Sequence, residues 1–357
     1  MSHEAGRKAK VLLIRFGSLG DVVLVGAVIE ALARDRPDVD VRLLVKARYA
    51  PLFRDDPRVA RVIALEDGGG VWGLLRLARS LRGERFGAVV DLHASLRSRL
   101  LGLLLGPVRI TRTRKRHWAR WAVVHAPWLG VRVPRTVEAY LDALAPLGVV
   151  SRCEPRLYVD AGAAREAQAF LADAGLRPAQ TLVGVHPGSR WPAKRWTSHG
   201  FAAVIEALSE RPGLRVMVLG DQTDRPFVDQ VVAHLGRRPI VAVGELKLTR
   251  LVALTDRCAV FLANDSGPMH IAAALGVPTV GLFGPTHPKL GFAPQGAHSK
   301  VLSVNAPCSP CSLHGSAPCK KARRACMEDL SPARVLEAIE PLIPGLPARA
   351  GPGAPTV

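Results

Sequence analysis

The sequence predicts an α/β protein with two open parallel sheets, each in its own domain. Short runs of Val, Leu and Ile alternate with helical patterns along most of the chain, which is typical of repeated strand–helix units. At 357 residues, with 48% hydrophobic and 22% charged residues, the chain has material for two cores. We therefore expect domains at 1–160 and 161–343, a hinge around 150–180, and a disordered Pro- and Gly-rich tail at 344–357.

The individual elements follow from the apolar runs. In the first half we expect strands at 10–16, 40–45, 61–65, 87–92 and 106–111, with helices at 21–34, 71–82 and 96–105. In the second half we expect strands at 181–187, 214–220, 239–243, 258–264 and 278–284, with a closing helix at 331–342. Open parallel sheets bind ligands in the crevice outside the carboxyl ends of their strands, so the loops there carry the candidate functional residues.

The sequence shows neither a membrane span nor a secretory signal. No apolar stretch reaches the roughly 18 residues that a spanning helix needs. The opening segment MSHEAGRKAKVLLIRFG has an acid among its bases and no small-residue cleavage site after an apolar run. We therefore expect a cytoplasmic protein.

Positive charge is concentrated in the first half. The net charge is +19, and residues 1–160 contain 28 Lys and Arg against 16 Asp and Glu. Within this half, residues 109–128 interleave bases with Trp118, Trp121 and Trp128. Such a segment is either a solvated basic face or a surface for an anionic membrane or an anionic acceptor. Charge alone would also suit nucleic acid, but no nucleic-acid-binding motif accompanies it, and we expect no such partner.

A glycine turn follows the first expected strand, in the segment RFGSLGDVV (15–23). Gly17 and Gly20 permit a tight turn, and Asp21 suits the N-terminus of the next helix, so a purely structural role would explain the segment. It matches neither the dinucleotide fingerprint nor the phosphate-binding P-loop. Its position after the first strand nevertheless predicts that Asp21 lies at the mouth of the crevice.

Cations crowd the loop after the first strand of the second half, GVHPGSRWPAKRWTSHGF (184–201). Four polar or charged residues of this loop are Ser189, Arg190, Lys194 and Arg195. They precede a helix that Thr197 or Ser198 would cap. Backbone N–H groups, a helix N-terminus and fixed cations together make an anion site, and the alternative is a basic surface loop.

Polar residues end the fourth strand of the second half. Asn264, Asp265 and Ser266 follow an apolar run, a Gly-Pro pair opens the next helix, and His270 lies in its first turn. Ser266 suits the N-cap position. Capping alone does not explain Asn264, Asp265 and His270 together at a strand end, where ligands bind.

Five segments in this order resemble glycosyltransferase family nine, the ADP-heptose:lipopolysaccharide heptosyltransferases. The segments are LIRFGSLGDVVL, DLHASLRSRL, HPGSRWPAKRW, LANDSGPMHIAAALGVPTVGLFGPT and the cysteine-bearing stretch that follows. The resemblance implies a GT-B fold, in which the first Rossmann-like domain binds the acceptor, the second binds the nucleotide-sugar, and a cleft separates them. It also implies an inverting transferase without a catalytic metal or other required cofactor.

The resemblance assigns roles to single residues. Asp21 matches the family's proposed catalytic base, and Lys194 matches the cation on the donor diphosphate, with Ser189 in the same loop. Asp265 matches an acid that binds the donor sugar. The positions that match the lining of the diphosphate are Ser266, Gly267 and His270. The expected acceptor contacts in the first domain are Arg97 with Asp91 and His93 beside it.

These roles imply transfer of a heptose from ADP-heptose to a lipopolysaccharide core. A base acts on the acceptor hydroxyl while cations stabilise the departing diphosphate. The acceptor would be an anionic lipid-linked saccharide, so we expect peripheral binding to the inner face of the inner membrane. Two alternatives remain, a related GT-B transferase with another nucleotide-sugar donor and a sugar-nucleotide-binding protein without catalysis. The presence of both Asp21 and Lys194 weighs against the second, because binding alone needs no base.

Four of the six cysteines cluster near the C-terminus with the spacing C-x2-C-x7-C-x6-C. They are Cys308, Cys311, Cys319 and Cys326. In a cytoplasmic protein a disulfide cluster is disfavoured, and four thiolates at short spacing suit a tetrahedral structural zinc. An iron–sulfur cluster and unliganded thiols are the alternatives.

Overall fold

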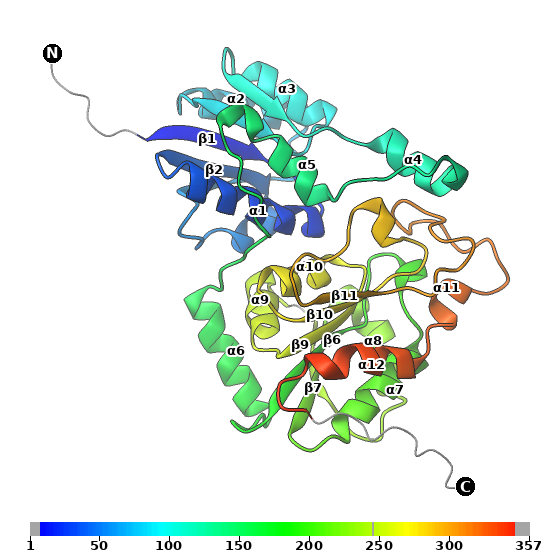
Figure 1. Cartoon of the computed structure of the whole chain (residues 1–357). Coiled ribbons are helices and arrows are strands. Elements are labelled where there is room, and N and C mark those ends of the chain that lie inside the picture. The colour runs from blue at the N-terminus through cyan, green and yellow to red at the C-terminus, as the bar shows by residue number, and fades with distance from the viewer. Residues whose placement is uncertain (1–7, 245, 347–357) are drawn as a thin grey trace, which may run out of the picture.

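The chain forms two α/β domains, each built on one parallel sheet (Figure 1). The structure is a computed structural model that describes residues 8–244 and 246–346. The first sheet uses strands up to residue 112, and the first element of the second domain, α6 (Ala161–Asp173), begins at the expected boundary. The α/β class is thus confirmed, while the boundary itself stays a prediction. Of the tail predicted to be disordered (344–357), the part after Leu346 lies outside the described residues.

The first sheet has five strands in the order β3-β2-β1-β4-β5. Their bounds are β1 Ala9–Ile14, β2 Val39–Lys46, β3 Arg61–Leu65, β4 Ala88–Asp91 and β5 Arg109–Arg112. In the register of the two central strands, Ile14 stands beside Asp91. From β1 the chain adds β2 and β3 on one side and then β4 and β5 on the other. The point between β1 and β4, where the strand order switches, is where open parallel sheets bind ligands.

Helices cover both faces of the first sheet. One face packs against α1 (Leu19–Asp35) and α5 (Thr136–Asp142), and the other against α2 (Gly70–Arg82) and α3 (Leu96–Leu104). The fourth helix of this domain, α4 (His117–His125), extends toward the second domain (Figure 1). Its Arg120 donates to the backbone carbonyl of Leu290 (3.1 Å).

The second sheet has six strands in the order β11-β10-β9-β6-β7-β8, which is the same winding with one more strand. The strands are β6 Thr181–His186, β7 Leu214–Asp221, β8 Ile240–Gly244, β9 Val260–Asn264, β10 Thr279–Leu282 and β11 Ser299–Leu302. Besides α6, the helices are α7 Ser198–Ser209, α8 Arg225–Val232, α9 Leu248–Asp256, α10 Gly267–Ala274, α11 Ala325–Glu328 and α12 Pro332–Ile339. All ten expected strands are present within a few residues of their predicted bounds.

The structure adds elements that the sequence patterns did not indicate. Strand β11 was not predicted, because SKVL is short, has only two apolar residues and stays partly exposed at the sheet edge. The featureless stretch around 150–180 contains the 13-residue helix α6, whose many alanines give a weak apolar pattern. Within residues 8–244 and 246–346, no helix is long and apolar enough to cross a bilayer.

The two domains touch directly through α1 and α10. A Cβ on Gly20 would lie 2.7 Å from a ring carbon of His270, and a Cβ on Gly267 would lie 2.5 Å from a Leu19 methyl carbon. Larger side chains at these glycines would push the helices apart. The contact therefore brings the start of α10 against the start of α1, at the carboxyl edges of both sheets.

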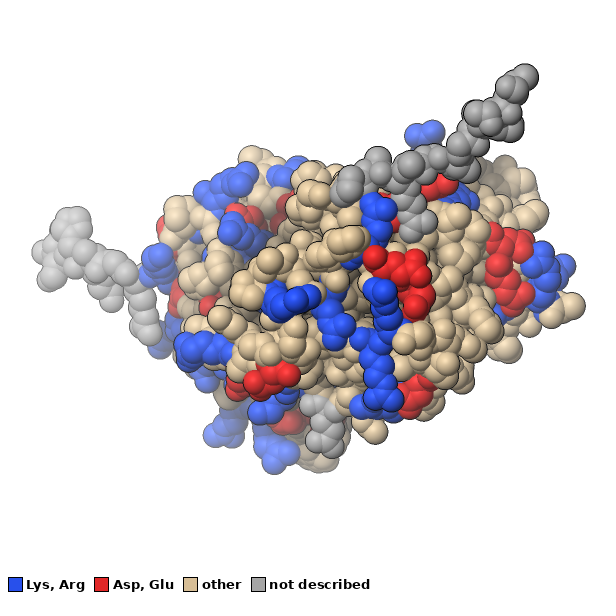
Figure 2. Space-filling model, turned by 90° about the horizontal axis from the view of Figure 1, so that it is seen from below, with Lys and Arg blue, Asp and Glu red and all other residues tan. Residues whose placement is uncertain are grey.

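Charges on the second domain are mixed in sign. Seen from the side of this domain, basic and acidic side chains are interspersed over the surface (Figure 2).

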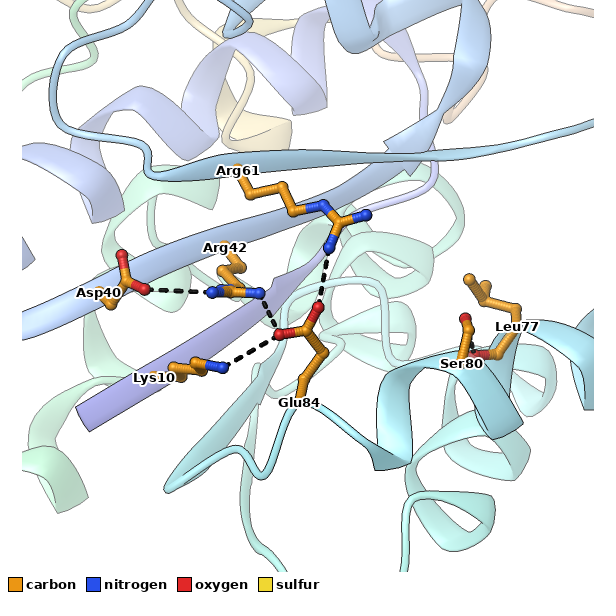
Figure 3. Close-up of polar contacts among 7 residues, drawn as sticks. All are labelled: Lys10, Asp40, Arg42, Arg61, Leu77, Ser80 and Glu84. Atoms are coloured by element: carbon orange, nitrogen blue, oxygen red, sulfur yellow. Dashed lines mark hydrogen bonds and ion pairs between the residues drawn. The ribbon is translucent and has the colours of Figure 1, made fainter. Parts of the chain in front are cut away.

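At the amino edge of the first sheet, Glu84 is surrounded by cations (Figure 3). Its carboxylate lies 3.1 Å from Lys10 Nζ and 2.8 Å from an Arg61 nitrogen, and it also pairs with Arg42. Arg42 in turn pairs with Asp40 (3.3 Å). The network ties the first three strands of the sheet to the segment before β4.

Candidate active site

Asp21 lies in the first turn of α1, directly after the turn that leaves β1. One carboxylate oxygen is 2.5 Å from an Arg15 nitrogen and accepts a hydrogen bond from the Ser18 hydroxyl (2.9 Å). The other oxygen accepts from the Tyr140 hydroxyl (3.2 Å). A second nitrogen of Arg15 donates to the carbonyl of Leu92 (3.0 Å), which fixes the guanidinium between β1 and the end of β4.

These contacts keep Asp21 ionised. Burial acts to raise the pKa of Asp21, but the charge of Arg15 and the hydrogen bonds from Ser18 and Tyr140 outweigh it and bring the pKa below its usual value. The pKa of Tyr140 is raised by burial and by the neighbouring Asp21, so its hydroxyl remains a donor. The site therefore presents a carboxylate, 17% exposed, at the end of the first sheet.

Lys194 ends a 3-10 turn (Pro192–Lys194) in the loop after β6. Its ammonium is 2.7 Å from one oxygen of Asp265, and the Thr286 hydroxyl donates to the same oxygen (2.6 Å). Both charged side chains are largely buried, at 13% and 10% exposure. The pair fixes an ammonium group at the carboxyl end of the second sheet.

His270 links the two halves of the site. Burial lowers its pKa, Asp265 and Asp21 act to raise it, and Lys194 lowers it further. The ring is therefore within electrostatic reach of charges from both domains. Its Nδ1 is buried, and no hydrogen-bond partner for it is found among the described residues.

The remaining predicted donor residues lie around the same strand ends. Ser266 occupies the N-cap position of α10, but its hydroxyl makes no capping bond and is buried without a partner in the described part of the chain. The capping role expected for the Ser266 hydroxyl is thus wrong. Gly267 packs against Leu19 of the first domain. Ser189 is buried, and its backbone carbonyl accepts from Arg195 (3.0 Å).

Asn264 has a structural explanation. Its side-chain oxygen accepts from the backbone N–H of Trp196 (3.0 Å), and its amide donates to the carbonyl of Pro187 (2.7 Å). Asn264 thus fastens the loop that holds Lys194. That loop leads into α7, which is capped by the Thr197 hydroxyl as one of the two predicted alternatives.

The predicted acceptor residues gather at the carboxyl edge of the first sheet. His93 and Arg97 both lie against Phe16, with the His93 ring centroid at 4.8 Å and the Arg97 guanidinium carbon at 5.8 Å. Burial, followed by the charges of Arg15 and Lys115, lowers the pKa of His93 to about 4, so the ring is neutral at physiological pH. Its Nδ1 is buried and lacks a partner among the described residues.

Asp91 is occupied by hydrogen bonds within the protein. It is buried and accepts from the backbone N–H groups of His93 (3.1 Å) and Ala94 (2.7 Å) and from the Ser98 hydroxyl (3.0 Å). The acid therefore shapes the turn from β4 into α3. It positions His93 rather than the acceptor.

The cysteine-bearing loop folds back over the Lys194 loop. Arg324 donates to the carbonyls of Pro192 and Arg195 (3.1 Å each). The Lys194 side chain packs against Gly315, where a Cβ would lie 2.7 Å from Lys194 Cγ. Burial lowers the pKa of the adjacent His314, followed by Lys194, while Asp21 acts in the opposite direction. His314 thus faces the same space between the domains.

The four clustered cysteines lie close enough to influence one another. The pKa of Cys326 is raised to about 11 by burial and then by the thiols of Cys311, Cys308 and Cys319. In the described residues, however, no group of three or more His, Cys, Asp or Glu side chains is arranged to hold a metal ion. The zinc prediction is therefore unconfirmed.

Four residues of the site were missed by the sequence analysis. They are Arg15, Tyr140, Thr286 and His314. Arg15 offered a signal, since a charge that closes an apolar strand before a glycine turn is unusual. The other three come from segments whose approach to the cleft depends on the tertiary fold.

Comparisons with known proteins identify the family of the chain. The model of glycosyltransferase family 9 (heptosyltransferase) matches residues 74–321. Lipopolysaccharide heptosyltransferase 2 of Salmonella typhimurium is 27% identical over 94% of this chain and 98% of its own. Lipopolysaccharide heptosyltransferase 1 of Pseudomonas aeruginosa is 29% identical over 85% of this chain and 86% of its own.

A solved structure of similar shape is also named as a heptosyltransferase. Escherichia coli ADP-heptose lipopolysaccharide heptosyltransferase II has a TM-score of 0.70 and 25% identity, covering 92% of this chain and 97% of its own. The family model itself matches well over half of the chain. The protein is therefore a glycosyltransferase that belongs to family 9, and its two facing α/β domains form the GT-B fold.

Proposed function

We propose that the protein transfers a heptose from ADP-heptose to a lipopolysaccharide core acceptor, with inversion and without a catalytic metal. One observation carries this proposal. A carboxylate of the first domain, Asp21, and an ammonium of the second, Lys194, both act on the pKa of His270 and of His314 between them. A base and an anion-stabilising cation across one cleft are what glycosyl transfer from a diphosphate requires.

In this proposal Asp21 takes the proton of the acceptor hydroxyl while that oxygen attacks the anomeric carbon. The bond from this carbon to the diphosphate oxygen breaks, and attack from the opposite face inverts the centre. Negative charge grows on the leaving ADP, where Lys194 and the N-terminus of α10 stabilise it. Asp265 holds Lys194 in place and binds hydroxyl groups of the donor sugar.

The donor pocket is expected to include the buried polar atoms that lack a protein partner. The Ser266 hydroxyl and His270 Nδ1 have no partner among the described residues, and a bound ligand would supply one. Ser189 and Gly267 lie on the loops beside them. In this proposal these residues line the donor diphosphate.

The identity of the donor's nucleobase, adenine, is proposed from the names of relatives. One relative is named as an ADP-heptose heptosyltransferase, and a further Escherichia coli heptosyltransferase was solved with ADP. A thermal-shift screen with ADP-, UDP-, GDP- and CMP-sugars tests the proposal, because ligand at about 100 times its Kd stabilises by about 2.7 kcal/mol. ADP-sugars should raise Tm most. A larger shift with a UDP-sugar would favour the alternative donor.

A transfer assay separates the enzyme from the non-catalytic alternative. Purified protein with ADP-heptose and a soluble core fragment should release ADP and extend the acceptor. Tight ADP-heptose binding without any product would favour a binding protein. Adding EDTA should leave the rate unchanged, whereas immediate loss of transfer that Mg²⁺ restores would contradict a metal-free mechanism.

The cysteine-bearing loop is proposed to hold a structural zinc. If Cys308, Cys311, Cys319 and Cys326 bind the metal, elemental analysis should find about one equivalent in purified protein. Cys311→Ala should then lower Tm clearly while leaving the single-turnover rate nearly unchanged. Protein free of zinc and iron would leave the thiols unliganded.

The acceptor is proposed to be anionic and held at the inner face of the inner membrane by the protein's basic first domain. Arg97 and His93 would contact the saccharide, and Trp118 and Trp121 are exposed beside a run of bases. Replacing the bases Arg112, Arg114, Lys115 and Arg116 by Ser should weaken binding to anionic liposomes. High salt should have the same effect, because screening weakens attraction between exposed charges and the leaflet.

A further inference from the structure

We propose that the outer surface of helices α2 and α3 docks on an anionic lipid bilayer. This inference rests on the proposed function, because a lipid-linked acceptor gives the enzyme a reason to reside at a bilayer. The surface, called the α2–α3 face below, consists of six exposed apolar side chains, namely Val71, Trp72, Leu75, Leu96, Leu100 and Leu103.

Large apolar side chains are strongly exposed on this face. Trp72 is 78% exposed, Leu96 is 85% exposed and Leu103 is 73% exposed. Single exposed apolar residues are ordinary on a soluble protein, whereas neighbouring ones mark an interaction site. Leu96, Leu100 and Leu103 stand at i, i+4 and i+7 on α3 and so form one stripe.

The fold itself does not use these side chains. The opposite sides of the same helices supply Leu74, Ala78 and Leu101 to the core, where they pack with Leu12 and Ile14 of β1. Both helices thus have a complete buried side. Exposing a second apolar side costs solubility, and contact with a bilayer would account for it.

The charges around the α2–α3 face indicate that its partner is an anionic bilayer. Neither helix contains an acidic residue, and together they carry five arginines, namely Arg76, Arg79, Arg82, Arg97 and Arg99. The surface of the second domain, by contrast, shows acids among its bases (Figure 2). Glu66 and Asp67 precede α2 and Glu84 follows it, but Asp67 and Glu84 are already paired with cations. Apolar side chains beside an excess of cations fit the headgroup region of an anionic leaflet.

The position of the α2–α3 face relative to the cleft also supports an anionic bilayer as its partner. Helices α2 and α3 each follow a parallel strand, so their first turns lie at the carboxyl edge of the first sheet. Leu96 there immediately precedes Arg97, a proposed acceptor contact. Both helices lie on the side of the first domain away from the second (Figure 1). Docking would bring the headgroup region to the acceptor side and leave the donor domain free.

An equally exposed apolar residue elsewhere provides a control. Trp72 on this face is 78% exposed, and Val150, which lies outside both this face and the basic segment 109–128, is 79% exposed. The full-length wild type, Trp72→Ser, Leu103→Ser and Val150→Ser are compared by co-sedimentation with phosphatidylcholine vesicles that contain or lack phosphatidylglycerol. We expect the Trp72 and Leu103 variants to bind anionic vesicles about tenfold more weakly, since each removes a large apolar group that the bilayer would bury. Val150→Ser should stay within about twofold of the wild type.

Three results would overturn the proposal. One is wild-type protein that does not bind anionic vesicles at low salt, and another is a Val150→Ser loss as large as that of Trp72→Ser. The third is a wild-type dimer that Leu103→Ser dissociates in analytical ultracentrifugation, which would assign the face to a second copy of the chain. Heptosyl transfer to a soluble acceptor is measured separately. Its absence in the wild type would refute the proposed function while leaving the vesicle result intact.

Discussion

The cations at the two edges of the first sheet differ in whether they have ion-pair partners within the protein. At the amino edge, the cations Lys10, Arg42 and Arg61 all pair with Glu84 (Figure 3). At the carboxyl edge, Lys115 and Arg97 have no ion pair with any described residue. Both edges belong to the same five strands, so the fold does not dictate the difference.

The difference indicates which edge is completed by a ligand. Burial lowers the pKa of Lys115, and the nearby Arg15 lowers it further, so an anion placed there would relieve repulsion between cations. At the amino edge the pKa of Glu84 is lowered chiefly by its hydrogen bond from Lys10, and each of the three cations already has a carboxylate partner within the protein. The amino edge therefore supports stability, and the carboxyl edge is suited to binding anionic substrates.

Among the cations, the largest effect is expected at Lys194, which lies at the carboxyl edge of the second sheet. Lys194→Ala should lower kcat by about 10²–10³ and weaken ADP binding, because the charge on the leaving diphosphate loses its counter-charge. Steady-state kinetics and calorimetry with ADP measure the two effects. Lys247→Ala, at an exposed lysine of the same domain, is the control. Equal behaviour of the two variants would remove Lys194 from the mechanism.

A smaller effect is expected at the acceptor cation. Arg97→Gln should raise the acceptor KM about tenfold, which corresponds to about 1.4 kcal/mol, through loss of a charge-assisted hydrogen bond. ADP affinity should not change. Arg54→Gln, which alters an exposed arginine of the same domain, should leave both quantities unaltered. If Arg97→Gln changed the affinity for ADP and left the acceptor KM unaltered, Arg97 would contact the donor and not the acceptor.

At the amino edge the expected effect is on stability alone. Glu84→Gln should cost about 1–2 kcal/mol in the free energy of unfolding, because three partly exposed ion pairs are lost together. Since the ion pairs lower the pKa of Glu84, its contribution is complete at neutral pH and is lost at an acidic pH below that lowered pKa. Denaturant titrations at both pH values, with exposed Glu166→Gln as the control, measure this. A change in transfer rate would show that the two edges are coupled.

The smallest expected effect is that of acidity on the rate. The pKa of Asp21 lies below its usual value, and that of His93 is about 4, so neither group titrates between about pH 5 and 7. The kcat/KM for a soluble acceptor should therefore be level on the acid side of neutrality. An acid limb near pH 6 that is absent in His93→Asn would show that His93 acts in its charged form.

The fold could be predicted from the sequence because parallel strands are buried on both faces. Their continuous apolar runs identified all ten of the expected strands, and β11 escaped because an edge strand needs few apolar residues. Turn residues after the strands then predicted Asp21, Lys194 and Asp265 at one crevice. Partners brought in by long loops or by the other domain, such as Tyr140 and Thr286, leave no local pattern.

The most direct test of the central claim, that Asp21 is the base, is a single-turnover measurement with Asp21→Asn. Donor and soluble acceptor are saturating, and ADP affinity is measured on the same preparation. The account predicts a rate lower by about 10²–10⁴, the usual contribution of a general base, with little change in ADP affinity. Because Arg15 loses its charge partner, Tm should fall, so the assay is run well below the variant's Tm. A rate close to that of the wild type would contradict the account.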